Sequence, residues 1–160
     1  MERYMGDLGE RDNVVAFNTL VRGLQAAYQR LLETRKSQSR DDMFIPVFDA
    51  LNWAVTIEFR DEWRSCDSDL GELFQALRFV RNRVHHQWAV AIYWKDGAVF
   101  PIKFPTPWHE WLWRSRGDLP PAGPGHPPKL EEETAYDLHL GQRSVWQTIQ
   151  EILEKLGVAP

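Results

Sequence analysis

One stretch of the chain combines a helical apolar pattern with polar residues capable of chemistry: Ala76-Leu-Arg-Phe-Val-Arg-Asn-Arg-Val-His-His-Gln-Trp88. Arg81, Asn82 and His86 occur within it in the order Arg-Asn-x-x-x-His. No acidic residue lies between Leu73 and Lys95, although the whole chain carries a formal charge of -4. The basic residues of this segment therefore form a local positive patch: Arg78, Arg81, Arg83 and Lys95, with His85 and His86 beside them.

The apolar residues of this segment predict a helix, because they recur at the steps of three and four that place side chains on one helix face. They are Leu70, Leu73, Leu77, Val80, Val84, Trp88 and Ala91. Ser68 is a suitable N-cap, and Glu72 adds negative charge to the first turn. Asn82 and His86 are expected one turn apart on a face that points away from the apolar stripe, with Arg78 close by.

Arg81 and His86 are expected to point well apart on a regular helix, so one straight helix does not bring both to the same atom. Three arrangements would bring them together. The long side chain of Arg81 reaches across, the helix is irregular, or a second copy of the chain supplies the partner residue. The third arrangement fits a two-fold dimer in which two such helices face each other.

The composition suits one folded domain over residues 1–160. Hydrophobic residues make up 43% of the chain, with eight Trp and eight Phe, which argues against disorder. The single Cys66 excludes an intramolecular disulfide and a cysteine-rich zinc site. The start of the chain is charged and lacks the apolar core of a signal peptide, and no apolar run approaches the roughly 18 residues of a membrane helix. We therefore expect a cytoplasmic protein without a membrane anchor.

Two further helices are predicted before the central one. The first is expected from a cap at Asn13 to about Lys36, with apolar residues at steps of three and four. The second is expected from Asp41 or Asp42 to about Trp63, with Pro46 near its first turn, where a missing N–H costs little. The acidic residues near its end are expected to be solvated or to balance the arginines of the central helix: Glu58, Asp61 and Glu62.

An irregular insertion is predicted at about residues 95–129. Ala89 to Trp94 continues the helix or forms a strand, and the Asp96-Gly97 turn signal would pair it with residues 98–104 in a small β-hairpin. The cluster from Trp108 to Arg114 suggests one or two helical turns. It would either stack on unpaired bases or pack on the core as a lid. The Pro- and Gly-rich run 119–125 is expected to be an exposed loop.

Helix is expected to resume at Lys129, to break near Gly141, and to restart from a cap at Ser144 until Gly157. The buried face of the last helix is predicted from Val145, Ile149, Ile152 and Leu156. The fold class is therefore all-α. We expect an antiparallel bundle of four or five helices, with the insertion and its possible hairpin before the C-terminal helix.

Arg81-Asn82-x-x-x-His86, on the third helix of a small helical protein, resembles the motif of the HEPN superfamily. That motif is Arg, four to six residues, then His, often with Asn directly after the Arg. The resemblance extends to the helices before the motif and the bundle helix after it, although its specific part is about six residues. It implies a single HEPN-like helical domain.

The resemblance implies a metal-independent endoribonuclease that acts as a toxin or defence effector or in RNA processing, and that dimerises through the motif helices. Arg81 and His86 would be the catalytic pair, with Asn82 as the supporting polar residue. RNA would be the substrate, and an antitoxin or regulatory protein is a possible partner. In one HEPN subgroup a Tyr that can be modified follows the motif His by two positions; here Trp88 occupies that position, so that form of regulation is not supported.

The residue types suit RNA cleavage without a cofactor. Histidine titrates near neutral pH and can serve as base or acid, while arginine keeps its charge and can grip phosphate oxygens. The 2′-OH of RNA would attack, leaving a 2′,3′-cyclic phosphate and a 5′-OH. Arg78, Arg83 and His85 are candidate contacts for the RNA backbone. Solvated charges are the alternative for the two arginines, and a structural role is the alternative for His85.

No metal site is predicted. His85 and His86 point about 100° apart on a helix, and the remaining histidines lack the spacing of metal ligands. Two other functions stay open: a catalytically silent HEPN-like module that binds a nucleotide or a protein, and a purely structural helical subunit. In both, Arg81, Asn82 and His86 would form a polar face or a dimer contact without chemistry.

Overall fold

The computed structural model describes the backbone of residues 3–67, 69–87, 90–97, 109–121 and 127–160, and their side chains except those of 3–15 and 83–87. Within these residues the chain forms a mainly helical bundle and a small antiparallel sheet, which confirms the predicted fold class. The elements are α1 (Arg3–Thr34), α2 (Arg40–Glu58), α3 (Leu70–Gln87), β1 (Ile92–Lys95), β2 (Glu110–Trp113), α4 (Leu130–His139) and α5 (Val145–Lys155).

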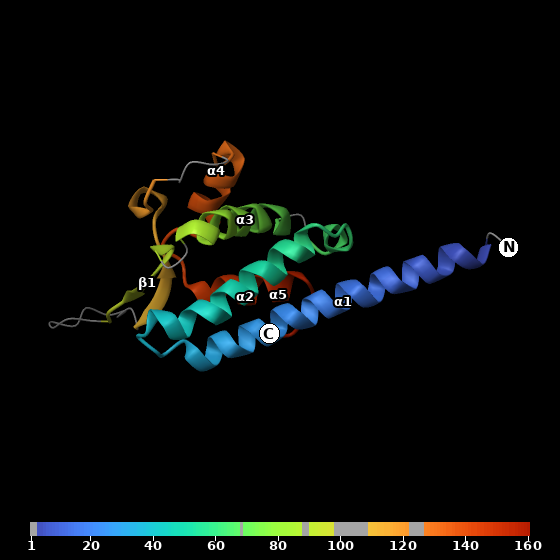
Figure 1. Cartoon of the computed structure of the whole chain (residues 1–160), viewed down its shortest axis with the longest axis horizontal. Coiled ribbons are helices and arrows are strands. Elements are labelled where there is room, and N and C mark those ends of the chain that lie inside the picture. Colours follow the sequence, from blue (N-terminus) through green and yellow to red (C-terminus); the bar gives the residue numbers. More distant parts are fainter. Residues whose placement is uncertain (1–2, 68, 88–89, 98–108, 122–126) are drawn as a thin grey trace.

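The helices pack in sequence-adjacent pairs. α1 lies against α2, and α3 lies between α2 and α4, while α5 contacts both α1 and β2. Figure 1 shows the N-terminal end of α1 extending beyond the other elements, and the two strands at the opposite end of the bundle. The core between these helices is apolar and continuous.

α1 and α2 form a helical hairpin whose ends differ from the prediction. α1 begins at Arg3, so Asn13 lies inside the helix and does not cap it. Ser39 is the N-cap of α2, and its side chain accepts a hydrogen bond from the backbone N–H of Asp42 at 3.3 Å. Pro46 lies in the second turn of α2, slightly later than expected. The predicted apolar stripe of α1 is confirmed from Val21 onward, because its members are buried: Val21, Leu24, Tyr28 and Leu31.

Close packing between α1 and α2 depends on Gly23. A Cβ atom at this position would lie 2.5 Å from fused-ring carbons of Trp53, closer than real contacts allow. Gly23→Ala is therefore expected to lower the free energy of unfolding by about 1–2 kcal/mol, because overpacking outweighs alanine's higher helix propensity. Thermal denaturation measures this change. In a Trp53→Leu background the same substitution should cost less, and an equal cost in both backgrounds would contradict the clash.

α3 is buried over a wider face than the sequence pattern predicted. Leu70, Leu73, Leu77 and Val80 are confirmed in the core, since each is at most 1% exposed. Phe74 and Phe79 are also buried, because α2 covers one side of α3 and α4 covers another. The Ser68 cap and the Val84 and Trp88 side chains lie outside the described residues.

The strand pairing corrects the predicted hairpin. Ile92–Lys95 is a strand, so of the two options for the segment after α3 the strand is confirmed. Its partner is Glu110–Trp113, with Ile92 opposite Trp113 and Lys95 opposite Glu110. The helical turns predicted for the Trp cluster are therefore wrong at Glu110–Trp113. The expected partner, 98–104, and Trp108 lie outside the described residues.

The C-terminal helices agree well with the prediction. α4 is one helix from Leu130 to His139, and α5 starts after Ser144, although no side-chain hydrogen bond from Ser144 caps it. The expected buried face of α5 is confirmed: Val145, Ile149, Ile152 and Leu156. Gly157 follows α5 with φ 73°, a left-handed conformation that glycine adopts without strain.

Candidate functional site

The Arg-Asn-x-x-x-His motif occupies the last two turns of α3, which is α-helical through Gln87. Asn82 is exposed and Arg81 is partly buried. His86 belongs to the helical backbone, and its side chain lies outside the described residues, as do those of Arg83 and His85. The structure thus places the motif on one helix and describes the side chains of its first two members.

The helical backbone across the motif narrows the ways in which Arg81 and His86 can meet. Five residues at about 100° each leave the two positions about 140° apart around the helix axis. Because α3 is a continuous α-helix here, an irregularity of the helix does not bring Arg81 and His86 together. The remaining arrangements are a reach by the long Arg81 side chain or a contribution from a second copy of the chain.

Arg81 is held against the bundle. Its Nε atom is buried and has no hydrogen-bond partner within the described part of the chain. A buried donor without a partner loses its hydration without compensation, at a typical cost of about 1–3 kcal/mol or more for a charged group. The Nε atoms of Arg78 and Arg114 are also buried without a hydrogen-bond partner, so this cost does not distinguish Arg81, and the sequence motif remains the reason to single it out.

Arg78 forms a partly buried ionic cluster with two carboxylates from neighbouring helices. Its Nη2 atom pairs with Oε1 of Glu58 on α2, and its Nε atom lies 3.7 Å from Oε1 of Glu132 on α4. The side chains of Arg78, Glu58 and Glu132 are 29%, 10% and 9% exposed, respectively. The prediction that Glu58 balances an arginine of α3 is confirmed, whereas its prediction as a solvated residue is wrong. The positive patch is free of acids only along the sequence.

Glu58 has a raised pKa, mainly because burial disfavours its charged form. Arg78 lowers this pKa by charge and by hydrogen bonding, and the nearby negative charge of Glu132 raises it. The Oε2 atom of Glu58 is buried without a hydrogen-bond partner. One cation thus faces two carboxylates in this cluster, and Arg78 is already engaged within the fold, which makes it a poor candidate for RNA contact.

The comparisons with known proteins leave the family open. No model of a known protein family matches the chain, and neither the curated proteins nor the solved structures include a significant match. The resemblance to the HEPN superfamily therefore stays an expectation, which rests on the sequence motif and on a helical architecture.

Two general features of the described residues bear on the site. None of the described helices is both long enough and apolar enough to cross a membrane. Within the same residues, no group of three or more His, Cys, Asp and Glu side chains is arranged to hold a metal ion.

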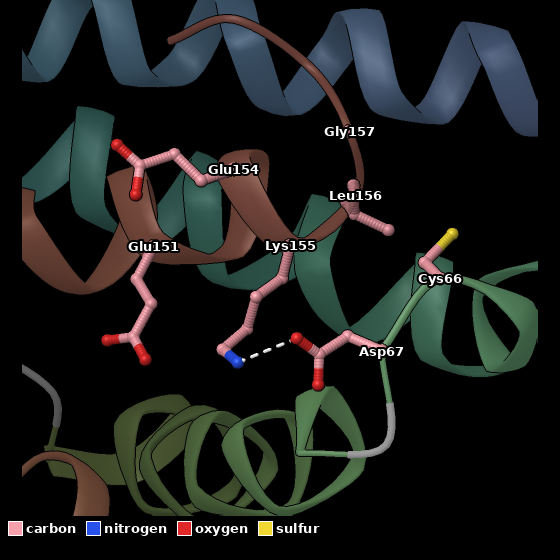
Figure 2. A pocket seen from close by; sticks show the side chains of 7 residues that line it. All are labelled: Cys66, Asp67, Glu151, Glu154, Lys155, Leu156 and Gly157. Carbon is pink, nitrogen blue, oxygen red and sulfur yellow. Dashed lines mark hydrogen bonds and ion pairs between the residues drawn. The ribbon is translucent and has the colours of Figure 1, made fainter.

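A shallow depression of about 550 Å³ lies where the end of α5 meets the loop before α3. Figure 2 shows Lys155 reaching from α5 to Asp67, with its Nζ atom 2.9 Å from Oδ2. The hydrogen bond to Lys155 is the main cause that lowers the pKa of Asp67, and the same bond raises the pKa of Lys155. Cys66, also on the rim, is a free and exposed thiol. The ion pair between Lys155 and Asp67 connects α5 to the loop that leads into α3, so we assign it a structural role.

A second cavity, of about 650 Å³, was not expected from the sequence. Its walls come from the residues after α1, from β1, from the start of β2 and from α5, and they carry both cations and aromatic rings. Its signal in the sequence is weak. Arg35 and Lys36 belong to a polar helix end, and Trp94 and Trp146 belong to apolar patterns typical of core residues.

Proposed function

We propose that the chain is a metal-independent endoribonuclease of the HEPN type that acts as a toxin or defence effector. The observation that carries the proposal is the placement of Arg81-Asn82-x-x-x-His86 on the last two turns of an α-helix within a helical bundle. Asn82 is exposed there, and Arg81 is partly exposed beside it. An exposed amide next to a partly exposed cation suits contact with an RNA phosphate.

In the proposed reaction, the 2′-OH of RNA attacks the adjacent phosphorus atom. His86 takes the 2′-OH proton or protonates the leaving 5′ oxygen, since its side chain titrates near neutral pH. Arg81 stabilises the negative charge that develops on the phosphorane, and Asn82 orients the phosphate by hydrogen bonding. The products are a 2′,3′-cyclic phosphate and a 5′-OH. Arg83 and His85 remain proposed RNA contacts.

We propose a homodimer as the active form. Arg81 and His86 point about 140° apart on α3, so the Arg81 of one protomer would complement the His86 of its partner across a two-fold axis. Two copies would then supply the separate base and acid that cleavage requires. An antitoxin or regulatory protein would bind over the paired helices.

His86→Ala tests the function directly. General acid–base catalysis typically contributes about 10²–10⁴-fold, so cleavage of mixed tRNA and mRNA in EDTA should fall by at least about 100-fold. Gel analysis of the products, with enzymatic tests of their end groups, measures the rate and identifies the cyclic phosphate. Size-exclusion chromatography and circular dichroism should show that the variant keeps its fold and oligomeric state.

His139→Ala is the matched control. His139 lies at the end of α4 and pairs with Glu72 near the start of α3, with its Nε2 atom 2.9 Å from Oε2, away from the motif end of the helix. This variant should retain wild-type cleavage. Equal cleavage by wild type and His86→Ala, or strict dependence on magnesium, would overturn the proposal. Absence of cleavage by the wild-type protein would favour a silent binding module.

A further inference from the structure

We propose that the 650 Å³ cavity between the end of α1, the two strands and α5 binds a nucleotide. The ligand is either a free nucleotide or one nucleotide unit of an RNA strand, which share the same base and phosphate chemistry. The cavity volume falls within the range of about 300–1,000 Å³ that is typical of small-molecule sites. This inference does not depend on whether the α3 motif cleaves RNA.

Two aromatic rings form one wall of the cavity and are held in place. The rings of Trp94 and His109 lie nearly parallel, with an interplanar angle of 8° and centroids 5.9 Å apart. Trp94 donates a hydrogen bond from Nε1 to Asp96 at 3.0 Å, and the Gly97 N–H donates to Nδ1 of His109 at 2.7 Å. Both orientations are therefore fixed before a ligand arrives, which reduces the entropy cost of stacking a base.

The lack of a side chain at Gly97 permits the close approach of the His109 ring. A Cβ atom at Gly97 would lie 3.1 Å from Nε2 of His109, so the absence of a side chain lets the ring approach the backbone closely. Because Nδ1 of His109 accepts the hydrogen bond, the proton of the neutral ring is on Nε2. That edge of the ring can donate a hydrogen bond to a ligand.

Two cations that form no ion pair among the described residues line the same cavity, together with one carboxylate, that of Glu110. Arg35 and Lys36 have no carboxylate within ion-pair distance among the described residues. The guanidinium of Arg35 lies 5.4 Å from the centre of the Trp146 ring, an attractive cation–π contact that positions the charge. With two cations against the single carboxylate of Glu110, the lining keeps a net positive charge beside aromatic rings, which fits a ligand that carries a phosphate.

The remaining polar groups of the wall suit the edge of a base. Gln38 and Gln147 can each donate and accept hydrogen bonds, and the carboxylate of Glu110 can accept from an exocyclic amine. Stacking on Trp94, hydrogen bonds to a base edge and a phosphate near Arg35 together describe a nucleotide. An inorganic anion would leave the aromatic wall unused.

Isothermal titration calorimetry of the full chain tests this site with three probes: AMP, UMP and a 2′-O-methyl RNA hexamer that a ribonuclease of the proposed type cannot cleave. We expect binding of at least one probe, and weakening of about 10-fold or more by Arg35→Gln, which removes a charged hydrogen-bond donor. Trp94→Leu should weaken binding by about 5- to 150-fold through loss of stacking. A preference for the hexamer that Arg35→Gln abolishes would identify an RNA strand as the source. An affinity for AMP or UMP at least equal to that for the hexamer would identify a free nucleotide.

Arg22→Gln is the matched control, because Arg22 is an exposed cation on α1 that does not line the cavity. It should leave binding unchanged. Arg35 is exposed, so Arg35→Gln is expected to fold normally even if Trp94→Leu disturbs the contact between Trp94 and Trp111. Absence of binding by all three probes at millimolar concentration, or equal binding by wild type and Arg35→Gln, would overturn the proposal.

Discussion

Replacing Arg78 with alanine is expected to lower the free energy of unfolding at pH 7 by about 3 kcal/mol or more. The substitution removes the cation that pairs with Glu58 and approaches Glu132, and both carboxylates have side chains no more than 10% exposed. Removing one partner of a buried ion pair leaves an uncompensated charge away from water, which costs more than the pair contributes. Urea denaturation followed by circular dichroism measures the change.

The loss should depend on pH in a defined direction. Burial raises the pKa of Glu58 in the folded state, so its protonated form is favoured by folding. This group contributes stability below the unfolded pKa of a glutamate, about 4.3, and the contribution is lost as pH rises through the raised folded pKa. In Arg78→Ala the lowering effect of the arginine is absent, so the pKa of Glu58 rises further. The difference in stability between the variant and the wild type should therefore shrink as pH falls below 7.

Glu58→Gln provides the control for this mechanism. In the Arg78→Ala background it removes one of the two unpaired carboxylates, so it should recover part of the lost stability at pH 7. Glu58→Gln alone should flatten the acid-to-neutral slope of the melting temperature. A loss below about 1 kcal/mol in Arg78→Ala, or the same loss at pH 5 and pH 7, would contradict the proposed contribution of the cluster to the free energy of unfolding.

The helices were predictable because their apolar residues repeat at helical spacing. α3 and α5 follow this pattern closely, and α2 starts near its predicted acidic residues. The strand pairing was not predictable in the same way. Trp111, Leu112 and Trp113 are all buried, so the alternation of polar and apolar residues that marks a half-exposed strand is missing. The Asp96-Gly97 signal also favoured a local partner, while the observed partner lies farther along the chain.

The candidate sites could also be predicted only in part, because periodicity reveals residues on one helix but not residues that packing brings together. The helix that carries Arg81, Asn82 and His86 follows from periodicity alone, because all three residues lie on one element. The carboxylates around Arg78 come from α2 and α4, so only the packing of three helices reveals them. The proposed base-stacking role of the Trp cluster is excluded for Trp111 and Trp113, since both are buried. The alternative, a lid packed on the core, is confirmed for these two residues.

The second large effect is expected from Trp113→Ala, which should lower the free energy of unfolding by about 3–5 kcal/mol. Trp113 on β2 is fully buried and packs in the core that includes α5. Its Nε1–H donates to Oγ1 of Thr148 at 3.1 Å, and its backbone N–H donates to the carbonyl of Arg143 at 3.0 Å. The substitution leaves a cavity and removes the indole donor, so it combines two costs. Chemical denaturation with near-ultraviolet circular dichroism measures both stability and packing.

One variant separates these two costs, and a second serves as a control at an exposed aromatic residue. Trp113→Phe keeps most of the apolar volume but removes the indole N–H, so its loss should be smaller, about 1–2 kcal/mol. The hydroxyl of Thr148 also donates to the carbonyl of Ser144 at 2.9 Å, so it keeps one partner in this variant. Phe59→Ala replaces an aromatic residue that is 76% exposed and should stay within about 0.5 kcal/mol of wild type. If Trp113→Ala cost no more than Phe59→Ala, β2 would not be anchored in the core, and the aromatic wall of the proposed nucleotide site would lose its support.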